Sequence, residues 1–418
     1  MRKSINLAEN TSDYVPRAAS NALHELLNVL PVGVVTGARQ AGKSRLLAAD
    51  PALDGHLLVN LDDPETRQEA VKDMGAFVRR APKMIIDEVQ RIPDILIAVK
   101  AVVDEEYQQT RGHFVLTGSA NLLLMKTVSE SLAGRAGYLT LEPMTRRELL
   151  GRAETGKWNM FFEQAPREWQ HTLDADQAGA ADWRDTVRRG GFPYPALRLD
   201  ERQRAAWFDG YVATYLERDL RDLTAIADLS DFRRAMQAFA IRAGTPVNAS
   251  AVAADLGLVA RTLRRWLDIL NVSYQLLQLP AYTVRQAARL RKRPKYYWND
   301  AGLALHLAGN PAPAGVHLET LVYSDLRAWA ALQLHRPQVM YWRDEDNREV
   351  DFVVEQKSKV VAFEVKATQN PGADDWQHLK HFVTHYHDKC LGGVLLHGGK
   401  DTYMISDKIV ATPWWRVL

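Results

Sequence analysis

A glycine-rich run near the amino terminus has the residue types and spacing of a phosphate-binding loop. The run, Gly37-Ala38-Arg39-Gln40-Ala41-Gly42-Lys43-Ser44, is a complete G-x-x-x-x-G-K-S. In this pattern backbone N–H groups surround the phosphates, the lysine reaches the β- and γ-phosphates, and the serine hydroxyl ligates Mg²⁺. The run lies between the apolar segment 32–36 and a helical pattern that starts at Arg45, the context such a loop requires. The sequence therefore predicts ATP bound by residues 37–45 and Mg²⁺ on Ser44.

Two adjacent acids supply the groups that hydrolysis of a nucleotide requires. Asp87 and Glu88 end the apolar run Met84-Ile85-Ile86. We expect Asp87 to support the metal and Glu88 to polarise the attacking water.

Two further residues are candidates for the same nucleotide site. Ser119 follows the apolar run 114–117, where a group that senses the γ-phosphate would lie, but the sequence does not single it out from its small polar neighbours. Arg135 could neutralise transition-state charge in its own site or in the site of a neighbouring subunit. The second case requires a homo-oligomer, and the sequence does not decide between the two. The alternative for Arg135 is a salt-bridged surface residue.

Four residues in the last hundred form a second chemical pattern. Strand alternation places Glu364 and Lys366 on one face, and Asp351 falls on a neighbouring strand. Glu319 lies upstream on an amphipathic helix. Together they resemble the core of the PD-(D/E)-x-K nucleases, which implies Mg²⁺ on Glu319, Asp351 and Glu364 and a lysine that positions water. Two alternatives stay open: an ion pair between Glu364 and Lys366, and a nuclease-like fold kept as a binding module.

The segment between these two sites contains a pattern typical of DNA-binding domains. Residues 248–258 and 262–267 have the spacing of two helices joined by a turn at Gly257, which is a helix-turn-helix pattern. Its second helix carries Arg261, Arg264 and Arg265. A stretch at 285–295 follows, with six basic residues in eleven and no acid, in the place of a wing hairpin. The candidate DNA contacts are Arg261, Arg264, Arg265, Arg291, Lys292 and Arg293. Such domains also serve as lids or bind protein partners, and charge runs are commonly just solvated.

These motifs jointly resemble a family of prokaryotic AAA-type ATPases that carry a conserved C-terminal region. The resemblance rests on the phosphate loop, on Ile-Ile-Asp-Glu-Val-Gln-Arg-Ile-Pro at 85–93, on Leu-Thr-Gly-Ser at 116–119 and on Ser-Leu-Ala-Gly-Arg at 131–135. It continues through motifs at 190–193, 215–220, 294–303 and 349–354. The resemblance implies an ATPase with a winged-helix domain near residue 260. Ala38 departs from the family, which often has proline there.

Hydrophobic patterns indicate the elements that would position these residues. Short apolar runs at 32–36, 57–61, 84–87, 114–117 and 138–141 alternate with helical patterns, which predicts an α/β domain with a mostly parallel five-stranded sheet. We expect four domains: an AAA-type P-loop domain over 1–145, a helical connector over 146–240, a winged-helix-like domain over 241–310, and an α/β restriction-endonuclease-like domain over 311–418. The last is predicted to have a helix over 317–333, strands at 350–355, 360–366 and 393–397, and a helix over 373–386.

Composition narrows the class of protein. The chain has 418 residues, of which 46% are hydrophobic and 25% charged, which disfavours a disordered protein, a collagen and a small disulfide scaffold. The single cysteine, Cys390, excludes an intramolecular disulfide. The sequence has neither a signal-peptide pattern nor a long apolar run, so we expect a cytoplasmic protein that does not enter membranes. These observations favour an ATPase that acts on DNA, with a nucleotide-dependent switch that binds a protein partner as the alternative.

Overall fold

The computed structural model describes residues 14–106, 111–118, 132–214, 228–284, 289, 292–310 and 312–418, which form two compact units. Unit 1 contains the chain up to Met144 together with Gly151–Glu154 and Val272–Tyr274, and unit 2 contains the remainder. Among the described helices, none is both long and apolar enough to span a bilayer.

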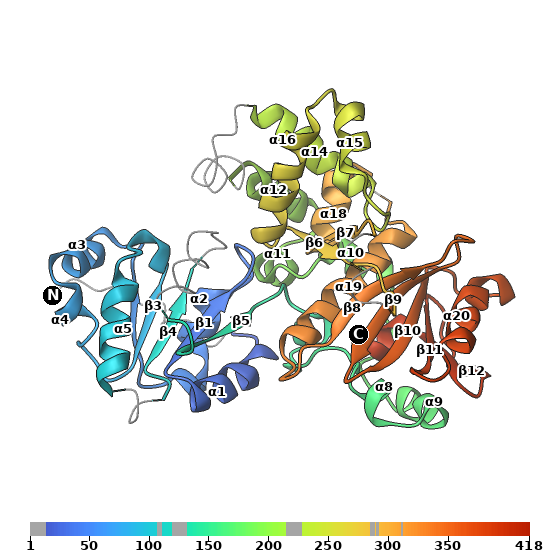
Figure 1. Cartoon of the computed structure of the whole chain (residues 1–418), viewed down its shortest axis with the longest axis horizontal. Helices are drawn as coiled ribbons and strands as arrows, with labels where there is room; N and C mark the ends of the chain where they lie inside the picture. The colour runs from blue at the N-terminus through green and yellow to red at the C-terminus, as the bar shows by residue number, and fades with distance from the viewer. Residues whose placement is uncertain are drawn as a thin grey trace. The chain divides into compact units, whose positions relative to one another are not determined.

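Unit 1 is built on a five-stranded parallel sheet with the order β2-β3-β4-β1-β5 (Figure 1). The strands are β1 Val32–Thr36, β2 Leu57–Asn60, β3 Met84–Asp87, β4 Phe114–Thr117 and β5 Ala136–Thr140. The helices are α1 Ala19–Val29, α2 Lys43–Ala49, α3 Pro64–Lys72, α4 Met74–Phe77 and α5 Ile95–Glu106, with short 3₁₀ turns at Pro51–Leu53 and Val89–Arg91. All five expected strands are present. The three central strands β3, β4 and β1 are buried throughout, as continuous apolar runs predict.

Unit 2 begins with short helices that lead into a three-helix segment. The first are α7 Arg146–Leu149, α8 Met160–Glu163, α9 Pro166–Asp174, α10 Trp183–Arg189, α11 Pro193–Arg198 and α12 Glu201–Thr214. The three-helix segment consists of α14 Leu229–Ile241, α15 Ala249–Leu256 and α16 Ala260–Val272. A two-stranded antiparallel sheet, β6 Leu276–Leu279 with β7 Lys295–Trp298, follows it and precedes α18 Ala301–Ala308.

The carboxyl-terminal part of unit 2 is a six-stranded mixed sheet with the order β12-β13-β11-β10-β9-β8. The strands are β8 Gln338–Arg343, β9 Glu349–Gln356, β10 Lys359–Lys366, β11 Cys390–His397, β12 Tyr403–Ser406 and β13 Ile409–Pro413. Its helices are α19 Gly315–Ala331, α20 Ala373–His385 and α21 Trp414–Val417. The predicted helices and strands of this part are present. Strands β8, β12 and β13 and helix α21 were not predicted.

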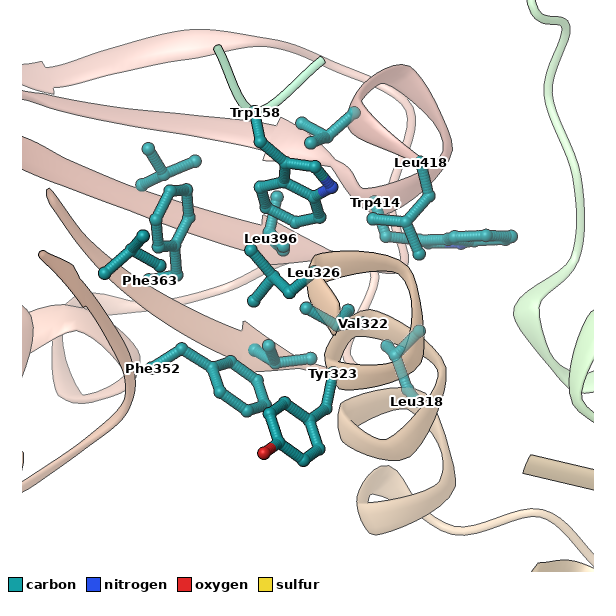
Figure 2. Packing of buried hydrophobic residues seen from close by; sticks show 14 of the residues in the cluster. Trp158, Leu318, Val322, Tyr323, Leu326, Phe352, Phe363, Leu396, Trp414 and Leu418 are labelled. Atoms are coloured by element: carbon teal, nitrogen blue, oxygen red, sulfur yellow. The ribbon is translucent and has the colours of Figure 1, made fainter. Parts of the chain in front are cut away.

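Helices α19 and α20 pack against separate apolar clusters of this sheet. Tyr323 and Leu326 of α19 belong to one cluster with Phe352 of β9 and Phe363 of β10, as Figure 2 shows. Trp158, Leu396, Trp414 and Leu418 complete the same cluster. The α20 side chains Leu379, Phe382 and Val383 pack instead against the second cluster, with Val353, Val360 and Ala362. Since successive strand residues point to opposite faces, the two helices cover opposite sides of the sheet.

Candidate functional site

The phosphate-binding loop starts at the carboxyl end of β1, in the centre of the parallel sheet. Gly37 has a φ of 138°, and a Cβ added there would lie 2.2 Å from the backbone oxygen of Leu141, so only glycine fits. Gly42 is left-handed, with a φ of 97°, and α2 begins directly after it. The two glycines thus give the loop the backbone form that the G-x-x-x-x-G-K-S pattern predicts.

Lys43 lies within the loop rather than on its outside. Its side chain is buried, and Nζ donates hydrogen bonds to the carbonyl oxygens of Gly37 at 3.0 Å and Ala38 at 2.9 Å. The ammonium is therefore held beside the loop backbone, where a nucleotide's phosphates bind in proteins with this loop.

Arg17 holds the phosphate-binding loop through hydrogen bonds to backbone carbonyls, a role that the sequence did not predict. The residue is 5% exposed. Its Nη1 donates to the carbonyl of Ala41 at 2.9 Å and its Nη2 to the carbonyl of Glu142 at 2.7 Å. One guanidinium therefore ties the phosphate loop to the segment after β5. No motif marks this arginine, because its partners are backbone atoms far away in the sequence.

The predicted magnesium residues are brought together by the sheet. The Ser44 hydroxyl and the Asp87 carboxylate form a side-chain hydrogen bond, although β4 separates β1 from β3. Burial, opposed in part by this hydrogen bond, raises the pKa of Asp87 above its ordinary value. A hydroxyl and a carboxylate are hard oxygen donors, so these residues fit the Mg²⁺ that accompanies ATP in P-loop proteins.

Glu88 adjoins this pair and is held by a neighbour. Its φ of 58° is left-handed, which is uncommon for a residue with a Cβ. The Gln90 amide donates a hydrogen bond to the Glu88 carboxylate, and the Glu88 N–H donates to Asp87 at 3.0 Å. Glu88 thus lies next to the predicted magnesium residues, as its predicted role in polarising water requires.

Arg135 does not join this chain's own phosphate loop. It directly precedes β5, whereas the loop follows β1, and these two strands are parallel with Val32 opposite Ala136. Arg135 therefore lies at the amino edge of the sheet and the loop at its carboxyl edge. Its guanidinium pairs with Asp104 of α5 and donates to the carbonyl of Ala133 at 3.1 Å. This position does not suit a role of Arg135 within its own site and agrees with the salt-bridged alternative, whereas a role in a neighbouring subunit's site stays a prediction. Ser119 lies outside the described residues.

The three arginines of the helix-turn-helix pattern all lie on α16. Asn248 caps α15 through hydrogen bonds from Ser250 N and Ala251 N, and Gly257 ends α15 in a left-handed conformation. One face of α16 is buried by Leu263, Trp266, Leu267, Ile269 and Leu270. Arg261, Arg264 and Arg265 are exposed. Arg264 also donates to the Ser250 hydroxyl at 3.0 Å. Within the part of the chain that the structure describes, Arg261 and Arg265 have no ion-pair partner, so their charge is directed to solvent.

The cationic stretch at 285–295 is only partly available to a ligand. Arg289 pairs with Glu355 of β9 at 2.8 Å, and Lys295 is 1% exposed and paired with Glu349. Lys292 and Arg293 are exposed, although the Lys292 Nζ donates to the carbonyl of Arg343 at 2.9 Å. Arg291 lies outside the described residues. Arg289 and Lys295 thus have acidic partners on β9 that the sequence does not indicate, and the DNA contacts expected at Arg291, Lys292 and Arg293 stay a prediction.

The carboxyl-terminal acids lie near one another but are matched by lysines. Lys366 Nζ pairs with Glu364 at 2.7 Å, and the Asp351 carboxylate accepts a hydrogen bond from Val365 N at 2.9 Å. Glu319 accepts a hydrogen bond from the buried Tyr297 hydroxyl at 3.0 Å. The ion pair between Glu364 and Lys366 is the one that the sequence left open as an alternative.

The pKa shifts in this region follow from burial and like charge. Burial, reinforced by the charge of Asp351, raises the pKa of Glu319 to about 8. The same two causes raise the pKa of Glu364 well above its ordinary value. Burial lowers the pKa of Lys295, but the carboxylates of Asp351, Glu349 and Glu319 outweigh it and leave this pKa raised. Positive charge is therefore favoured in this cluster of acids.

These residues do not fit a metal ion in the arrangement that the structure has. Among the described residues, no group of three or more His, Cys, Asp or Glu side chains is placed to hold one. The pairing of β8 with β9 passes from Met340↔Val353 to Trp342↔Val350, so β9 contains one extra residue at Asp351 and Phe352. Such a bulge changes the direction in which side chains of the strand point, so simple strand alternation does not predict the orientation of Asp351. The assignment of Glu319, Asp351 and Glu364 as metal ligands stays a prediction.

Three parts of the chain match the models of known domain families. Residues 31–150 match the model of an AAA domain, residues 180–314 match a domain of unknown function (DUF8612), and residues 314–417 match another (DUF4143). The uncharacterized protein Rv2008c of Mycobacterium tuberculosis is 29% identical over 411 residues, 96% of this chain and 84% of that protein. An uncharacterized protein of Haemophilus influenzae is 21% identical over 375 residues, 84% of this chain and 86% of that protein.

Solved structures give more distant likenesses. The Walker-type ATPase PABY2304 of Pyrococcus abyssi is 15% identical and has a TM-score of 0.43, with 71% of this chain and 99% of that chain covered. A single-substitution variant of RuvB from Thermotoga maritima is 18% identical with a TM-score of 0.28, and the match covers 69% of this chain and 95% of that chain. The AAA match and the geometry of the loop, Ser44 and Asp87 agree: over residues 31–150, this chain forms an AAA-type P-loop ATPase domain.

Proposed function

We propose that this protein is a Mg²⁺-dependent ATPase that acts on DNA, in repair, recombination or defence. The hydrolytic part of the proposal rests on the hydrogen bond between Ser44 and Asp87, with Glu88 as the next residue. Mg²⁺, when bound, would neutralise charge on the β- and γ-phosphates. The chain's own residues would do the rest: loop N–H groups and Lys43 hold the phosphates, Ser44 and Asp87 hold the metal, and the Glu88 carboxylate orients the attacking water.

The DNA part of the proposal is supported by one observation on α16. One face of α16 is buried within unit 2. The opposite face exposes Arg261 and Arg265 to solvent, and neither has an ion-pair partner among the described residues. Arginines so placed suit contact with phosphates or with base edges in a groove. We assign the helices α14 to α16, with β6 and β7, as a winged-helix-like DNA-binding segment on this basis.

A second candidate function is a nucleotide-dependent switch that binds a protein partner, with a catalytically inert nuclease-like domain. This function is favoured by the ion pairs Lys366–Glu364 and Lys295–Glu349 in the carboxyl-terminal region, because a lysine there neutralises each of the two acids. In this case the AAA domain would still hydrolyse ATP, but the carboxyl-terminal sheet would serve as a scaffold.

A paired assay of ATP hydrolysis and DNA cleavage separates the two candidates. It uses the full-length wild type, Lys43→Ala, Asp351→Ala and Glu364→Ala, with Mg²⁺ or Mn²⁺. The proposal requires that Lys43→Ala abolish hydrolysis and that Asp351→Ala and Glu364→Ala leave hydrolysis intact. DNA cleavage lost in the latter two variants alone would establish a nuclease. DNA handling that depends on Lys43 but on neither acid would favour the inert domain.

A further inference from the structure

Unit 1 includes a short segment from far along the chain. The segment Val272–Tyr274 belongs to this unit, although a long stretch of unit 2 separates it from the rest of unit 1 in the sequence. Helix α16 ends at Val272, and Gln275 again belongs to unit 2. The chain therefore contributes three residues to unit 1 here and then returns to unit 2.

The Tyr274 hydroxyl contacts the residue that directly precedes the phosphate-binding loop. It lies 3.0 Å from the Oγ1 atom of Thr36, which ends β1 and is 3% exposed. Thr36 Oγ1 also donates to the carbonyl of Leu139 at 3.5 Å, and both hydrogen bonds form together when the tyrosine donates to Thr36. Gly37, the first residue of the loop, follows Thr36 directly. Tyr274 thus holds the point at which the loop leaves the sheet.

The backbone of Tyr274 has a conformation that few residues adopt. Its φ is 58°, in the left-handed region, where a bulky side chain is uncommon. Such a conformation costs free energy and persists only where the surrounding structure imposes it. The next residue, Gln275, is 1% exposed, and its N–H donates to the carbonyl of Leu270 at 2.9 Å. Its carbonyl accepts a hydrogen bond from Asn299 N at 3.0 Å, so the fold fixes the backbone beside Tyr274.

We propose that Tyr274 is a positioning residue of the nucleotide site. Its hydroxyl holds Thr36, and thereby the start of the phosphate-binding loop, in the form that binds ATP. The loop N–H groups must point inward together to bind phosphates, so a fixed start lowers the entropy cost of ordering the loop around the nucleotide. Since the two contacts are linked, bound nucleotide in turn holds the segment 272–274 on unit 1. The proposal rests on nucleotide binding by the loop and not on DNA.

A double-mutant cycle on nucleotide affinity tests this role of Tyr274. The full-length wild type, Tyr274→Phe, Thr36→Val and the double variant are titrated with a fluorescent ATP analogue and Mg²⁺. Loss of one neutral hydrogen bond changes an equilibrium by about two- to tenfold, so each single variant should bind the analogue more weakly by that factor. The double variant should bind no more weakly than the single ones, because all three lose the same hydrogen bond. Tyr194→Phe, which removes an exposed hydroxyl of unit 2, should bind as the wild type does.

Hydrogen–deuterium exchange gives a readout that a purely structural role of Tyr274 would not change. In the wild type, a non-hydrolysable ATP analogue should slow the exchange of the backbone amides of residues 272–275. This protection should be smaller in Tyr274→Phe and absent in Lys43→Ala, which removes the lysine of the loop. Equal protection in the wild type and Tyr274→Phe would contradict the proposed link.

Two further results would overturn the proposal. One is a Tyr274→Phe protein that is folded, as judged by near-ultraviolet circular dichroism and a cooperative melt, yet binds the analogue as tightly as the wild type. The other is a double variant in which the two single effects multiply. If Tyr274→Phe does not fold, Thr36→Val is compared with Thr36→Ser, which keeps the hydroxyl and should bind as the wild type does. A wild type that binds no nucleotide would overturn the ATPase as well, whereas the first two results overturn the role of Tyr274 alone.

Discussion

The Ser44 hydroxyl and the Asp87 carboxylate are hydrogen-bonded across the carboxyl ends of β1 and β3, with the strand β4 between them in the sheet. In a parallel sheet all carboxyl ends share one edge, so residues 43 positions apart in the sequence meet there. Glu88 follows directly and reaches the same edge. This convergence is the structural basis for treating residues 37–45, Asp87 and Glu88 as one nucleotide site.

Glu88→Gln is expected to separate binding from hydrolysis. The substitution keeps the shape of the side chain and removes the charge that orients water, so ATP affinity should stay within about threefold of the wild type while turnover falls by roughly 10²–10⁴-fold. Steady-state hydrolysis and titration with a fluorescent ATP analogue measure the two effects. Glu105→Gln, at an exposed acid of the same unit, should change neither. A Glu88→Gln protein with full turnover would remove Glu88 from the mechanism.

Arg17→Met is expected to loosen the phosphate loop. The buried guanidinium makes hydrogen bonds to the Ala41 and Glu142 carbonyls, and loss of bonds from a charged donor costs about 1.5–3 kcal/mol each. We expect the free energy of unfolding to fall by ~3–6 kcal/mol and ATP affinity to fall about tenfold. Denaturant melts and ATP titrations measure these quantities.

The matched control for Arg17 is Arg79→Met, which removes an exposed arginine paired with Glu105. It should cost less than about 1 kcal/mol, because surface ion pairs contribute little. An equal decrease in the free energy of unfolding of the two variants would show that the hydrogen bonds of Arg17 to the loop contribute no more than a surface ion pair does.

Removal of Arg261 and Arg265 is expected to weaken DNA binding in a salt-dependent way. Each phosphate contact contributes about 0.9 to the slope of log affinity against log salt on duplex DNA. The double variant Arg261→Ala/Arg265→Ala should therefore show a slope smaller by roughly two, measured by fluorescence anisotropy from about 50 to 200 mM salt. Arg167→Ala, at an exposed arginine of α9, is the control. An unchanged slope and affinity would exclude α16 as the DNA contact.

Asp325 is expected to make stability fall as the pH rises. Burial raises its pKa to about 6, although Trp158 Nε1 and Gly156 N donate to it at 2.7 and 2.8 Å. A carboxyl whose folded pKa exceeds its unfolded value contributes stability below the unfolded pKa near 4 and loses it as the pH passes through 6. The loss between about pH 4 and pH 7 is on the order of 3 kcal/mol.

Asp325→Asn keeps an oxygen acceptor and removes the charge, so it should be less sensitive to pH than the wild type and more stable above about pH 7. Urea melts of both proteins at pH 4, 5.5 and 7.5 measure the difference. Parallel pH dependence in the two proteins would contradict the assignment to Asp325.

Local sequence patterns predicted many of the strands, helices and motif residues. Features that depend on contacts between residues distant in the sequence were not predicted. The five parallel strands, the glycines of the loop and the arginines of α16 follow from apolar runs and motif spacing. Arg17 and Lys295 were missed as members of the sites because their partners are distant in sequence, and Lys295 was expected to belong to a cationic wing hairpin. Arg135 was expected near a nucleotide on motif order alone, but strand direction places it at the opposite edge of the sheet. The bulge at Asp351 has no local signal.

The coupling of ATP turnover to DNA is tested by the hydrolysis rate with and without duplex, single-stranded and branched DNA. We expect at least one of these DNAs to raise the wild-type rate several-fold. The Arg261→Ala/Arg265→Ala protein should keep the basal rate but lose the stimulation. A wild-type rate unaffected by every DNA, with the ATPase otherwise active, would contradict the claim.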